Sequence, residues 1–434
     1  MSEPDVSFKP GRDFAVALDR GDPLGRFRDE FHIPKRENGE EEIYFAGNSL
    51  GLLPKRAPKY VQEELEKWKR LAVKAHFAGE NPWMPYHELL AEPMARLVGA
   101  SASASTSEVV TMNSLTVNLH LMMASFYRPT RERHRILLEE HAFPSDDYAL
   151  ESQAIVHGFD PSETLVRLRP DIHKGEHSID TAGVAQVLAR EGESIALVLL
   201  PGVQYYTGEA FDIEAITRLA QAKGCVVGFD LAHAAGNVVL RMHECNVDFA
   251  VWCTYKYLNS GPGSVGGCFV HERHGMRQDL PRLAGWWGHD KKSRFRMEPG
   301  FRPIPGAEGW QLSNPPILSL AAIRASLDVF MEAGGMEPLR EKSLSLTGYL
   351  EWLLAREIGD SVEILTPRDP RRRGCQLSLR VKSSRSGKTV LERLEASGVT
   401  CDWREPDVIR VAPVPLYNRY EEVYRFVQIL RNAL

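Results

Sequence analysis

Two charged side chains stand at the ends of neighbouring apolar runs in the middle of the chain. Asp230 closes the run CVVGFD, and Lys256 follows the run DFAVWC and precedes a turn rich in glycine and proline. In an open α/β sheet, ligands bind at the carboxyl ends of the strands. The two side chains are therefore expected to project into one crevice, where a charged pair needs a chemical reason.

Pyridoxal 5'-phosphate (PLP) would use both groups. An amine such as that of Lys256 forms an imine with the cofactor aldehyde, and a carboxylate such as Asp230 holds a proton on the pyridine nitrogen, which makes the ring an electron sink. Each residue alone has an ordinary interpretation, because Asp230 could cap a helix and Lys256 could make a surface ion pair. Their joint position favours the cofactor site.

The surrounding segments predict a parallel sheet covered by helices. Continuous apolar runs near residues 135, 194, 225, 248 and 266 are typical of strands buried on both faces. The segment 211–224 between two of these runs predicts a helix that ends at Gly224, which completes a βαβ unit. Beyond a stretch rich in glycine and proline at 300–316 and a long apolar helix, the order is helix, strand, helix, strand, helix. We predict an α/β fold with a large PLP-binding domain at 70–325, and a small domain formed by 1–69 and the α+β part 326–434.

Composition excludes several classes of protein. Hydrophobic residues at 43% and charged residues at 26% are ordinary for a globular chain, and the net charge of −5 is not gathered into blocks. We therefore expect neither a nucleic-acid partner nor a membrane span, and the start of the chain lacks the apolar core of a signal peptide. The expected location is the cytoplasm. Six cysteines without a CxxC pair predict neither a disulfide framework nor a zinc ribbon, and no metal site is expected.

Three short motifs fail on their context. GNSLG at 47–51 matches G-x-S-x-G but leads into LLPKRAP, where a nucleophile elbow needs a helix. GPGSVG at 261–266 matches a dinucleotide-binding pattern but precedes a strand. HERH at 271–274 lacks the spacing of a helical zinc pair, so we expect a solvated loop there.

Six motifs resemble kynureninase, a fold type I PLP enzyme of the class-V aminotransferase-like group. They are GFDLAHAAGN, DFAVWCTYKYLNSGPG, HAFPSDDYALESQ, LPGVQYYTGE, SNPPIL and IRVAPVPLYN, and matching stretches run in one order from Asn48 to the C-terminal part. The resemblance implies the PLP-transferase fold with a mainly parallel seven-stranded sheet. It also implies hydrolytic Cβ–Cγ cleavage of kynurenine or 3-hydroxykynurenine to anthranilate or 3-hydroxyanthranilate plus alanine, as in tryptophan degradation and de novo NAD synthesis.

The resemblance also implies roles for the reacting groups. Lys256 would remove the substrate α proton while Asp230 pairs with the ring nitrogen. Tyr255 would contact the phosphate and donate a proton to the β carbon. Arg410 would pair with the substrate α-carboxylate, for which a guanidinium fork is well shaped.

Further matches concern cofactor and substrate binding. Leu115 and Thr116 would bind the phosphate at a helix start, and Trp286 and Asn314 would reach it from a partner subunit, which implies a homodimer with shared active sites. In the FPSD motif, Phe143 would stack on the ring and Asp146 would lie near its nitrogen. The remaining implied contacts are Pro144, Ser145 and His233 for the cofactor, and Ser49, His76 and Asn314 at the aromatic end of the substrate.

Two residues depart from the family pattern. Pro201 stands where many relatives have serine or threonine, which removes one hydroxyl near the cofactor. Trp287 stands where a smaller aromatic residue is common, which bears on the preference for the 3-hydroxy group. Taken singly, Phe143 could belong to the core, His233 to a helix and Arg410 to a surface ion pair.

Two other functions remain open from the sequence. A fold type I aminotransferase or a lyase like the cysteine desulfurases would keep the cofactor. A desulfurase needs a nucleophilic cysteine on a mobile loop, whereas Cys375 in CQLSLRV is expected in a strand. A PLP-binding scaffold without catalysis is the other alternative, against which the intact Lys256, Tyr255 and Arg410 speak.

Overall fold

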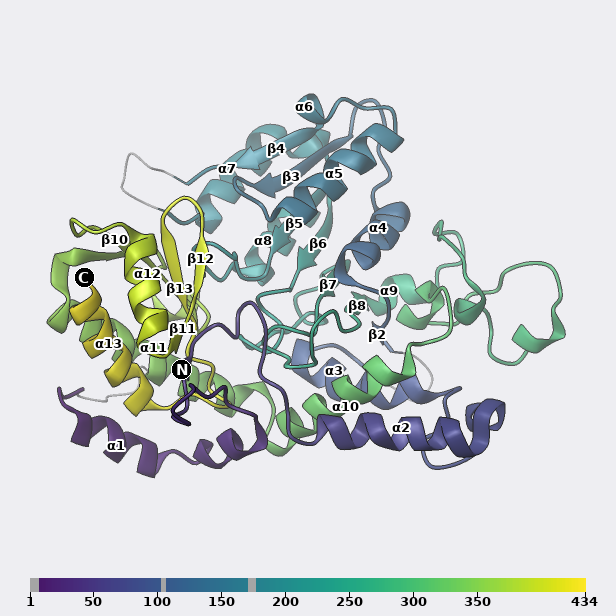
Figure 1. The fold of residues 1–434 in the computed structure, drawn as a ribbon. Helices are drawn as coiled ribbons and strands as arrows, with labels where there is room; N and C mark the ends of the chain where they lie inside the picture. The colour runs from purple at the N-terminus through teal and green to yellow at the C-terminus, as the bar shows by residue number, and fades with distance from the viewer. Residues whose placement is uncertain (1–7, 103–106, 171–176) are drawn as a thin grey trace.

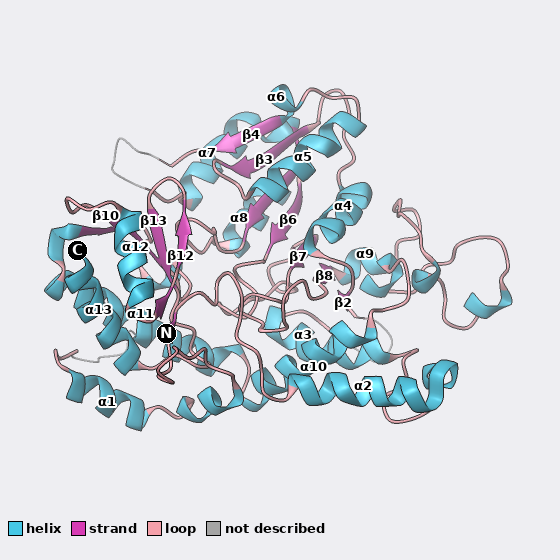
Figure 2. Cartoon of the chain, viewed as in Figure 1, coloured by secondary structure: helices cyan, strands magenta, loops and turns pink. Residues whose placement is uncertain are grey.

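A seven-stranded sheet forms the centre of the protein (Figures 1 and 2). The computed structural model describes residues 8–102, 107–170 and 177–434. The strands follow the spatial order β2-β8-β7-β6-β5-β3-β4. Their bounds are β2 (Val109–Thr111), β3 (Arg135–Glu139), β4 (Leu165–Leu168), β5 (Ile195–Pro201), β6 (Val226–Asp230), β7 (Phe249–Trp252) and β8 (Gly267–Val270).

The pairing pattern brings the ends of the central strands together. Strands β4, β3, β5, β6 and β7 are parallel, and β8 is antiparallel to both β7 and β2. Across β5 and β6, Pro201 is paired with Asp230, so both strands end at the same level. The carboxyl ends of the parallel strands therefore form one edge, as α/β ligand sites require.

Helices cover both faces of this sheet. Along each strand, successive side chains point to opposite faces. Leu137 and Val198 pack in one hydrophobic core with α7 (Thr181–Glu191) and α8 (Ile213–Gln221). Their neighbours Ile136 and Leu199 pack in another core with helices α4 and α5. Burial on both sides explains why the strands are continuous apolar runs. The two helices on the second face are α4 (Leu115–Phe126) and α5 (Pro144–Val156).

A second, antiparallel sheet lies in the C-terminal part. Its order is β12-β13-β10-β9, and its core contains Leu379, Leu350, Leu394 and Phe426 together with Ala15 from the N-terminal helix. Figure 1 shows the first helix lying against the last one although about the whole chain separates them. The elements are β9 (Val362–Ile364), β10 (Leu377–Val381), β12 (Asp402–Arg404), β13 (Val408–Val411), α1 (Arg12–Gly21), α11 (Met336–Glu357), α12 (Gly387–Ala396) and α13 (Tyr420–Ala433).

The remaining elements connect these two parts. Helix α2 packs along α10, where the Tyr60 hydroxyl donates a hydrogen bond to Asp328 at 2.7 Å. A short parallel pair, β1 with β11, joins the N-terminal segment to the C-terminal part. The bounds are α2 (Ala57–Leu71), α3 (Ala91–Val98), α6 (Pro161–Thr164), α9 (Glu272–Gly275), α10 (Ile317–Glu332), β1 (Ile43–Tyr44) and β11 (Val399–Thr400).

The predicted fold class is confirmed. All five predicted apolar runs are strands of the central sheet, and the helix expected within 211–224 is α8. The domain limits at 70 and 325 stay a prediction. All six cysteines are free, and five of them are buried. Within the described ranges, no helix combines the length and the apolarity that crossing a bilayer requires.

The expectation of a solvated loop at 271–274 is wrong. His271 is buried, and the His274 ring lies 2.7 Å from the Asp248 carboxylate. The motif HERH lies where β8 ends and packs against the segment that precedes β7. The four residues alone do not predict this tertiary contact.

Candidate active site

A cavity of about 110 Å³ opens at the carboxyl ends of β3, β5 and β6. It receives residues from the starts of α4 and α5 and from the segment after β7. Most of the residues expected to bind the cofactor line it. The lining residues are Leu115, Thr116, Glu139, Phe143, Ser145, Asp146, Pro201, Val203, Tyr205, Asp230, Ala232, His233, Tyr255 and Lys256.

The amine of Lys256 lies inside this cavity. Its Nζ donates a hydrogen bond to His233 Nε2 at 3.0 Å and lies 5.8 Å from the centre of the Phe143 ring. Burial lowers the pKa of His233 well below its usual value, and the positive charges of Lys256 and Arg410 lower it further. His233 is therefore neutral at pH 7 and accepts from the ammonium. Its Nδ1 is buried without a protein partner.

Asp230 and Asp146 form a hydrogen-bonded carboxyl pair in the same cavity. Burial raises the pKa of Asp146 well above its usual range, and the charge of Asp230 raises it further. Burial also raises the pKa of Asp230, against hydrogen bonds from Asp146 and from the backbone N–H of Ala232 at 2.6 Å. The proton therefore resides on Asp146, while Asp230 stays the acceptor. One Asp146 oxygen has no partner among the described residues.

A third carboxyl, Glu139, was not predicted from the sequence. It ends β3 and lines the cavity with only 4% of its surface exposed. Burial raises its pKa to about 8, and the negative charges of Asp230 and Asp147 add to the shift. The site thus gathers three carboxyls around one amine. Such a cluster favours a ligand that brings a positive charge.

Two helix starts form another wall of the cavity. Helix α4 begins at Leu115, and its N-cap residue Ser114 makes no side-chain capping bond, so the first N–H groups remain available to an anion. The hydroxyl of Thr116 lies 2.7 Å from that of Ser145 in the first turn of α5. A Cβ at Gly266 would lie 3.2 Å from the Leu115 nitrogen and 2.8 Å from the Trp252 oxygen, so a glycine is needed behind this helix start.

The aromatic residues expected near the cofactor divide between these walls. The Phe143 ring is 43% exposed and meets the Tyr205 ring edge-on at 5.3 Å between centroids. Pro144 follows as the first residue of α5 and lies outside the lining set. Burial raises the pKa of Tyr255, and the neighbouring Cys253 adds to the shift, so its phenol keeps its proton at neutral pH.

Arg410 lies next to the cavity rather than in its lining. The side chain is fully buried, and Nη1 donates to the backbone oxygen of Tyr205 at 2.8 Å. Its Nε donates to Asp402 at 2.6 Å, and Nη2 bonds the other Asp402 oxygen and the Ser49 hydroxyl. Burial opposes ionisation of Asp402, but these bonds outweigh it and hold its pKa below the usual value. Asp402 and Tyr205 had not been predicted.

The motif GNSLG is explained by close packing. A Cβ at Gly47 would lie 2.3 Å from the Tyr417 hydroxyl, and one at Gly51 would lie 2.3 Å from the Lys256 backbone oxygen. The Gly51 N–H donates to the Tyr255 oxygen at 2.8 Å. Its glycines let the N-terminal segment contact the lysine loop, and Ser49 is placed against Arg410 instead of a histidine base.

Besides Pro144, Arg410 and Ser49, three further predicted site residues lie outside the cavity lining. Trp286 is 40% exposed, and its indole N–H donates to the Arg294 backbone at 3.0 Å. His76 packs edge-on against Trp83, with 5.2 Å between the ring centroids. Asn314 is exposed. Trp287, by contrast, is buried, and the centre of its ring lies 4.5 Å from the Arg294 guanidinium carbon.

Comparison with known proteins identifies the family of this chain. The family model for the kynureninase C-terminal domain matches residues 339–430. A kynureninase of Koribacter versatilis is 56% identical over 423 residues, which cover 98% of each chain, and one of Myxococcus xanthus is 55% identical with the same coverage. The chain belongs to the kynureninase family. It is accordingly a PLP-dependent hydrolase, and cleavage of kynurenine in general follows from the family.

Solved structures support the fold of this family member. A C-DES variant with glycine linked to its PLP cofactor superposes with a TM-score of 0.75 at 17% identity, covering 93% of this chain and 98% of that one. The apo cysteine desulfurase of Thermococcus onnurineus gives a TM-score of 0.71 at 16% identity, covering 90% and 94%. At this identity the likeness concerns the fold alone, which is that of fold type I PLP enzymes.

The residues of the cavity fit PLP. The amine of Lys256, whose contact within hydrogen-bonding distance is His233, can bond an aldehyde. One oxygen of Asp146 and Nδ1 of His233 have no partner among the residues that the structure describes and can bond polar groups of a ligand. The carboxyl pair suits a protonated ring nitrogen, while the start of α4 suits a phosphate. Kynureninase family membership and the site therefore agree on the cofactor.

Replacing Glu139 by Gln should flatten the pH dependence of stability in the cofactor-free enzyme. The pKa of folded Glu139 is about 8 against an ordinary 4.5, so between these values the folded state holds a proton that the unfolded state has lost. The free energy of unfolding therefore falls as pH rises through this window, by up to about 1.4 kcal/mol per pH unit from this group.

Urea unfolding at pH 5, 6.5 and 8 measures the effect. The control is Glu140→Gln, which removes the adjacent carboxylate that pairs with Arg169. If the free energy of unfolding has the same pH dependence in Glu139→Gln and in the wild type, the raised pKa of Glu139 is wrong.

Proposed function

We propose that the enzyme cleaves the Cβ–Cγ bond of kynurenine, 3-hydroxykynurenine or both by hydrolysis. The products are anthranilate or 3-hydroxyanthranilate and alanine, as in tryptophan degradation and de novo NAD synthesis. The observation that carries this proposal is the meeting of one amine with a buried carboxyl pair in a single cavity, with a buried arginine next to that cavity. A cytoplasmic location, and the absence of nucleic-acid and membrane partners, remain predictions from composition.

The proposed roles follow from charge and position. Bound PLP supplies an electron sink for the α carbon of the substrate. Asp230, with the proton of the pair on Asp146, holds the ring nitrogen in its protonated form. Lys256 carries the α proton, and the neutral His233 beside it can hold that amine in place. Tyr255 keeps its phenolic proton and serves as the acid for the β carbon.

The cysteines disfavour a desulfurase reaction. None of the six is exposed, since five are buried and Cys245 is half-buried. Burial raises the pKa of Cys375 to about 12, and it also raises the pKa of Cys253, the cysteine near Lys256. A desulfurase nucleophile needs an accessible thiolate. The structural likeness to desulfurases therefore does not extend to their chemistry.

The wild-type enzyme with PLP should release anthranilate and alanine from kynurenine, or the hydroxylated analogue from 3-hydroxykynurenine. Lys256→Ala should abolish turnover and the visible absorbance of the lysine-linked cofactor, because no other amine lies in the cavity lining. Product fluorescence and amino-acid analysis measure the reaction for each substrate. Cofactor binding without product from either substrate would overturn the proposal.

The proposed receptor for the substrate α-carboxylate is Arg410. Its Nε edge is occupied by Asp402, which fixes the guanidinium plane, and Nη1 reaches the backbone of the cavity residue Tyr205. These bonds and the Nη2 bonds to Asp402 and Ser49 leave one N–H of Nη1, which a guanidinium held in this way offers to a carboxylate at little entropic cost. Ser49 adds a hydroxyl on the same side.

Arg410→Lys should lower kcat/KM by about 10- to 100-fold, mainly through KM, because an ammonium cannot reproduce the fork or satisfy Asp402. Steady-state kinetics with the preferred substrate measure the loss. The control is Arg380→Lys in the same sheet, whose partners Asp407 and Glu363 lie outside the cavity lining. Similar losses in both variants would count against a substrate role.

We propose a homodimer because two residues expected at the phosphate, Trp286 and Asn314, do not line the cavity of their own chain. Trp286 forms an exposed aromatic cluster with Phe295 and Phe77, at 5.4 and 6.3 Å between successive ring centroids, and the three side chains are 40%, 51% and 68% exposed. Figure 1 shows the segment around 280–303 projecting from the body of the protein. Large exposed apolar clusters mark association sites. We propose that Trp286 and Asn314 complete the phosphate end of the partner's cavity.

Mixed dimers test this arrangement. Lys256→Ala and Trp286→Ala homodimers should each be weakly active or inactive. After subunit exchange in equal amounts, about a quarter of the wild-type activity should return, because half the dimers are mixed and each has one intact site. Lys256→Ala exchanged with itself is the control. If exchange is shown by tagged subunits and no activity returns, Trp286 does not act across the interface.

A further inference from the structure

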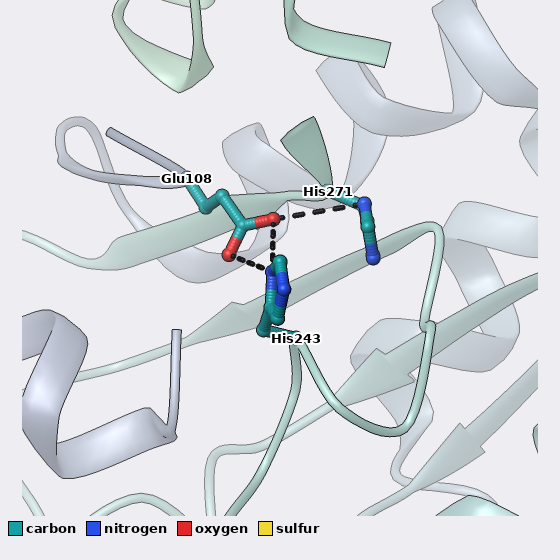
Figure 3. Close-up of side chains that lie close together, drawn as sticks. All are labelled: Glu108, His243 and His271. Carbon is teal, nitrogen blue, oxygen red and sulfur yellow. Dashed lines mark hydrogen bonds and ion pairs between the residues drawn. The ribbon is translucent and has the colours of Figure 1, made fainter. Parts of the chain in front are cut away.

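Three potential metal ligands lie close together (Figure 3). They lie at the end of the central strands that is opposite to the cavity. Glu108 directly precedes β2, His271 directly follows β8, and His243 lies in the segment before β7. Because β8 is antiparallel to β2 and β7, its end meets their starts. The catalytic lysine follows the other end of β7, so this cluster is separate from the cavity.

The ligand atoms of the cluster are close together. Glu108 Oε1 lies 3.0 Å from His243 Nδ1 and 3.6 Å from His271 Nδ1, and all three ligand atoms lie within 4.8 Å of one another. The exposed fractions of the side chains are 3% for Glu108, 9% for His271 and 38% for His243. One ligand is therefore accessible from solvent while the other two are fixed inside.

Glu108 is a buried carboxylate without a permanent positive partner. Among the residues that the structure describes, no lysine or arginine forms an ion pair with it, and the nearby Arg273 pairs with Asp248 at 2.6 Å. Backbone N–H groups of Ser101 and Glu272 donate to its two oxygens at 2.7 Å each and fix its orientation. Such hydrogen bonds hold a first ligand in place without neutralising it.

A second cluster shows the contrasting case. His87, Glu88 and Glu308 also come within ligand distance of one another. There, Lys291 lies 2.8 Å from Glu88 and 2.6 Å from Glu308, so a side chain already supplies the cation. The first cluster has the ligands but lacks this built-in charge.

We propose that Glu108, His243 and His271 bind a divalent transition-metal ion of the zinc class. Two imidazole nitrogens and one carboxylate oxygen are a ligand set that zinc accepts, with water in the fourth position. The two rings are stacked at 5.0 Å and 18°, so one must turn for both lone pairs to converge. The half-exposed His243 can do so. The ion would tie three segments of the sheet edge together and would take no part in the reaction.

Zinc titration of the chelator-treated enzyme, followed by calorimetry, tests the site. We expect one site per chain in the wild type, with affinity lowered at least ~10-fold in His243→Ala and in Glu108→Gln. Zinc should also raise the melting temperature of the wild type by ~2 °C or more, and of neither variant. His32→Ala, which removes an exposed histidine elsewhere, should bind as the wild type does.

The outcome separates the proposal from simple packing. Equal zinc affinity in the wild type and His243→Ala would overturn it, as would the absence of binding at ~100 µM zinc. His243→Gln, which keeps a polar side chain, is the second variant if alanine disturbs the fold, as judged by circular dichroism. Turnover with and without zinc should agree within about twofold, because the cluster lies at the opposite edge from the cavity.

Discussion

The burial of acidic groups in one cavity with a single amine is the constraint on which the rest of the structure depends. Asp230, Asp146 and Glu139 lie at strand and helix ends where little water reaches them, and each has a raised pKa because burial disfavours its charged form. Transferring one ionised carboxylate from water costs several kcal/mol unless it is paired. A ligand with a protonated ring nitrogen offsets that cost at the point where it arises.

The two-faced sheet is what makes this burial possible. Leu199 and Val227 belong to different hydrophobic cores, one on each face, so the strands that carry the acidic groups are held from both sides. The helix start at Leu115 then adds N–H groups to the same end of the sheet, and the first turn of α5 adds the Ser145 hydroxyl. The catalytic geometry is therefore a consequence of parallel strands ending level, and it needs no special backbone at Asp230.

The N-terminal segment and the small sheet pack closely against the site. Gly51 lies where any side chain would strike the lysine loop, and the Arg410 guanidinium links Asp402 on one strand to the Tyr205 backbone near the cavity. Arg410 is thus held by groups from three regions of the chain. Movement of the small sheet relative to the large one would change the position of the arginine with respect to Lys256.

Much of this arrangement could be predicted because local signals and tertiary structure agree. The apolar runs that end in Asp230 and lead to Lys256 identify buried strands, and the motif around Phe143 identifies the third wall. Glu139 escaped prediction because a glutamate after an apolar run usually reaches solvent. Asp402 escaped it because the three-residue strand β12 has only partly buried residues and no clear alternation.

The two ends of the central strands differ in how far their residues can be predicted from the sequence. At the carboxyl end of the strands, the order of the motifs predicts which residues surround Lys256. At the other end, Glu108, His243 and His271 are separated by more than a hundred residues in one interval and belong to no shared motif. Only the antiparallel pairing of β8 with both β2 and β7 brings them together. Because strand direction is set by the whole fold, residues that meet through a reversed strand are the ones that a linear motif search misses.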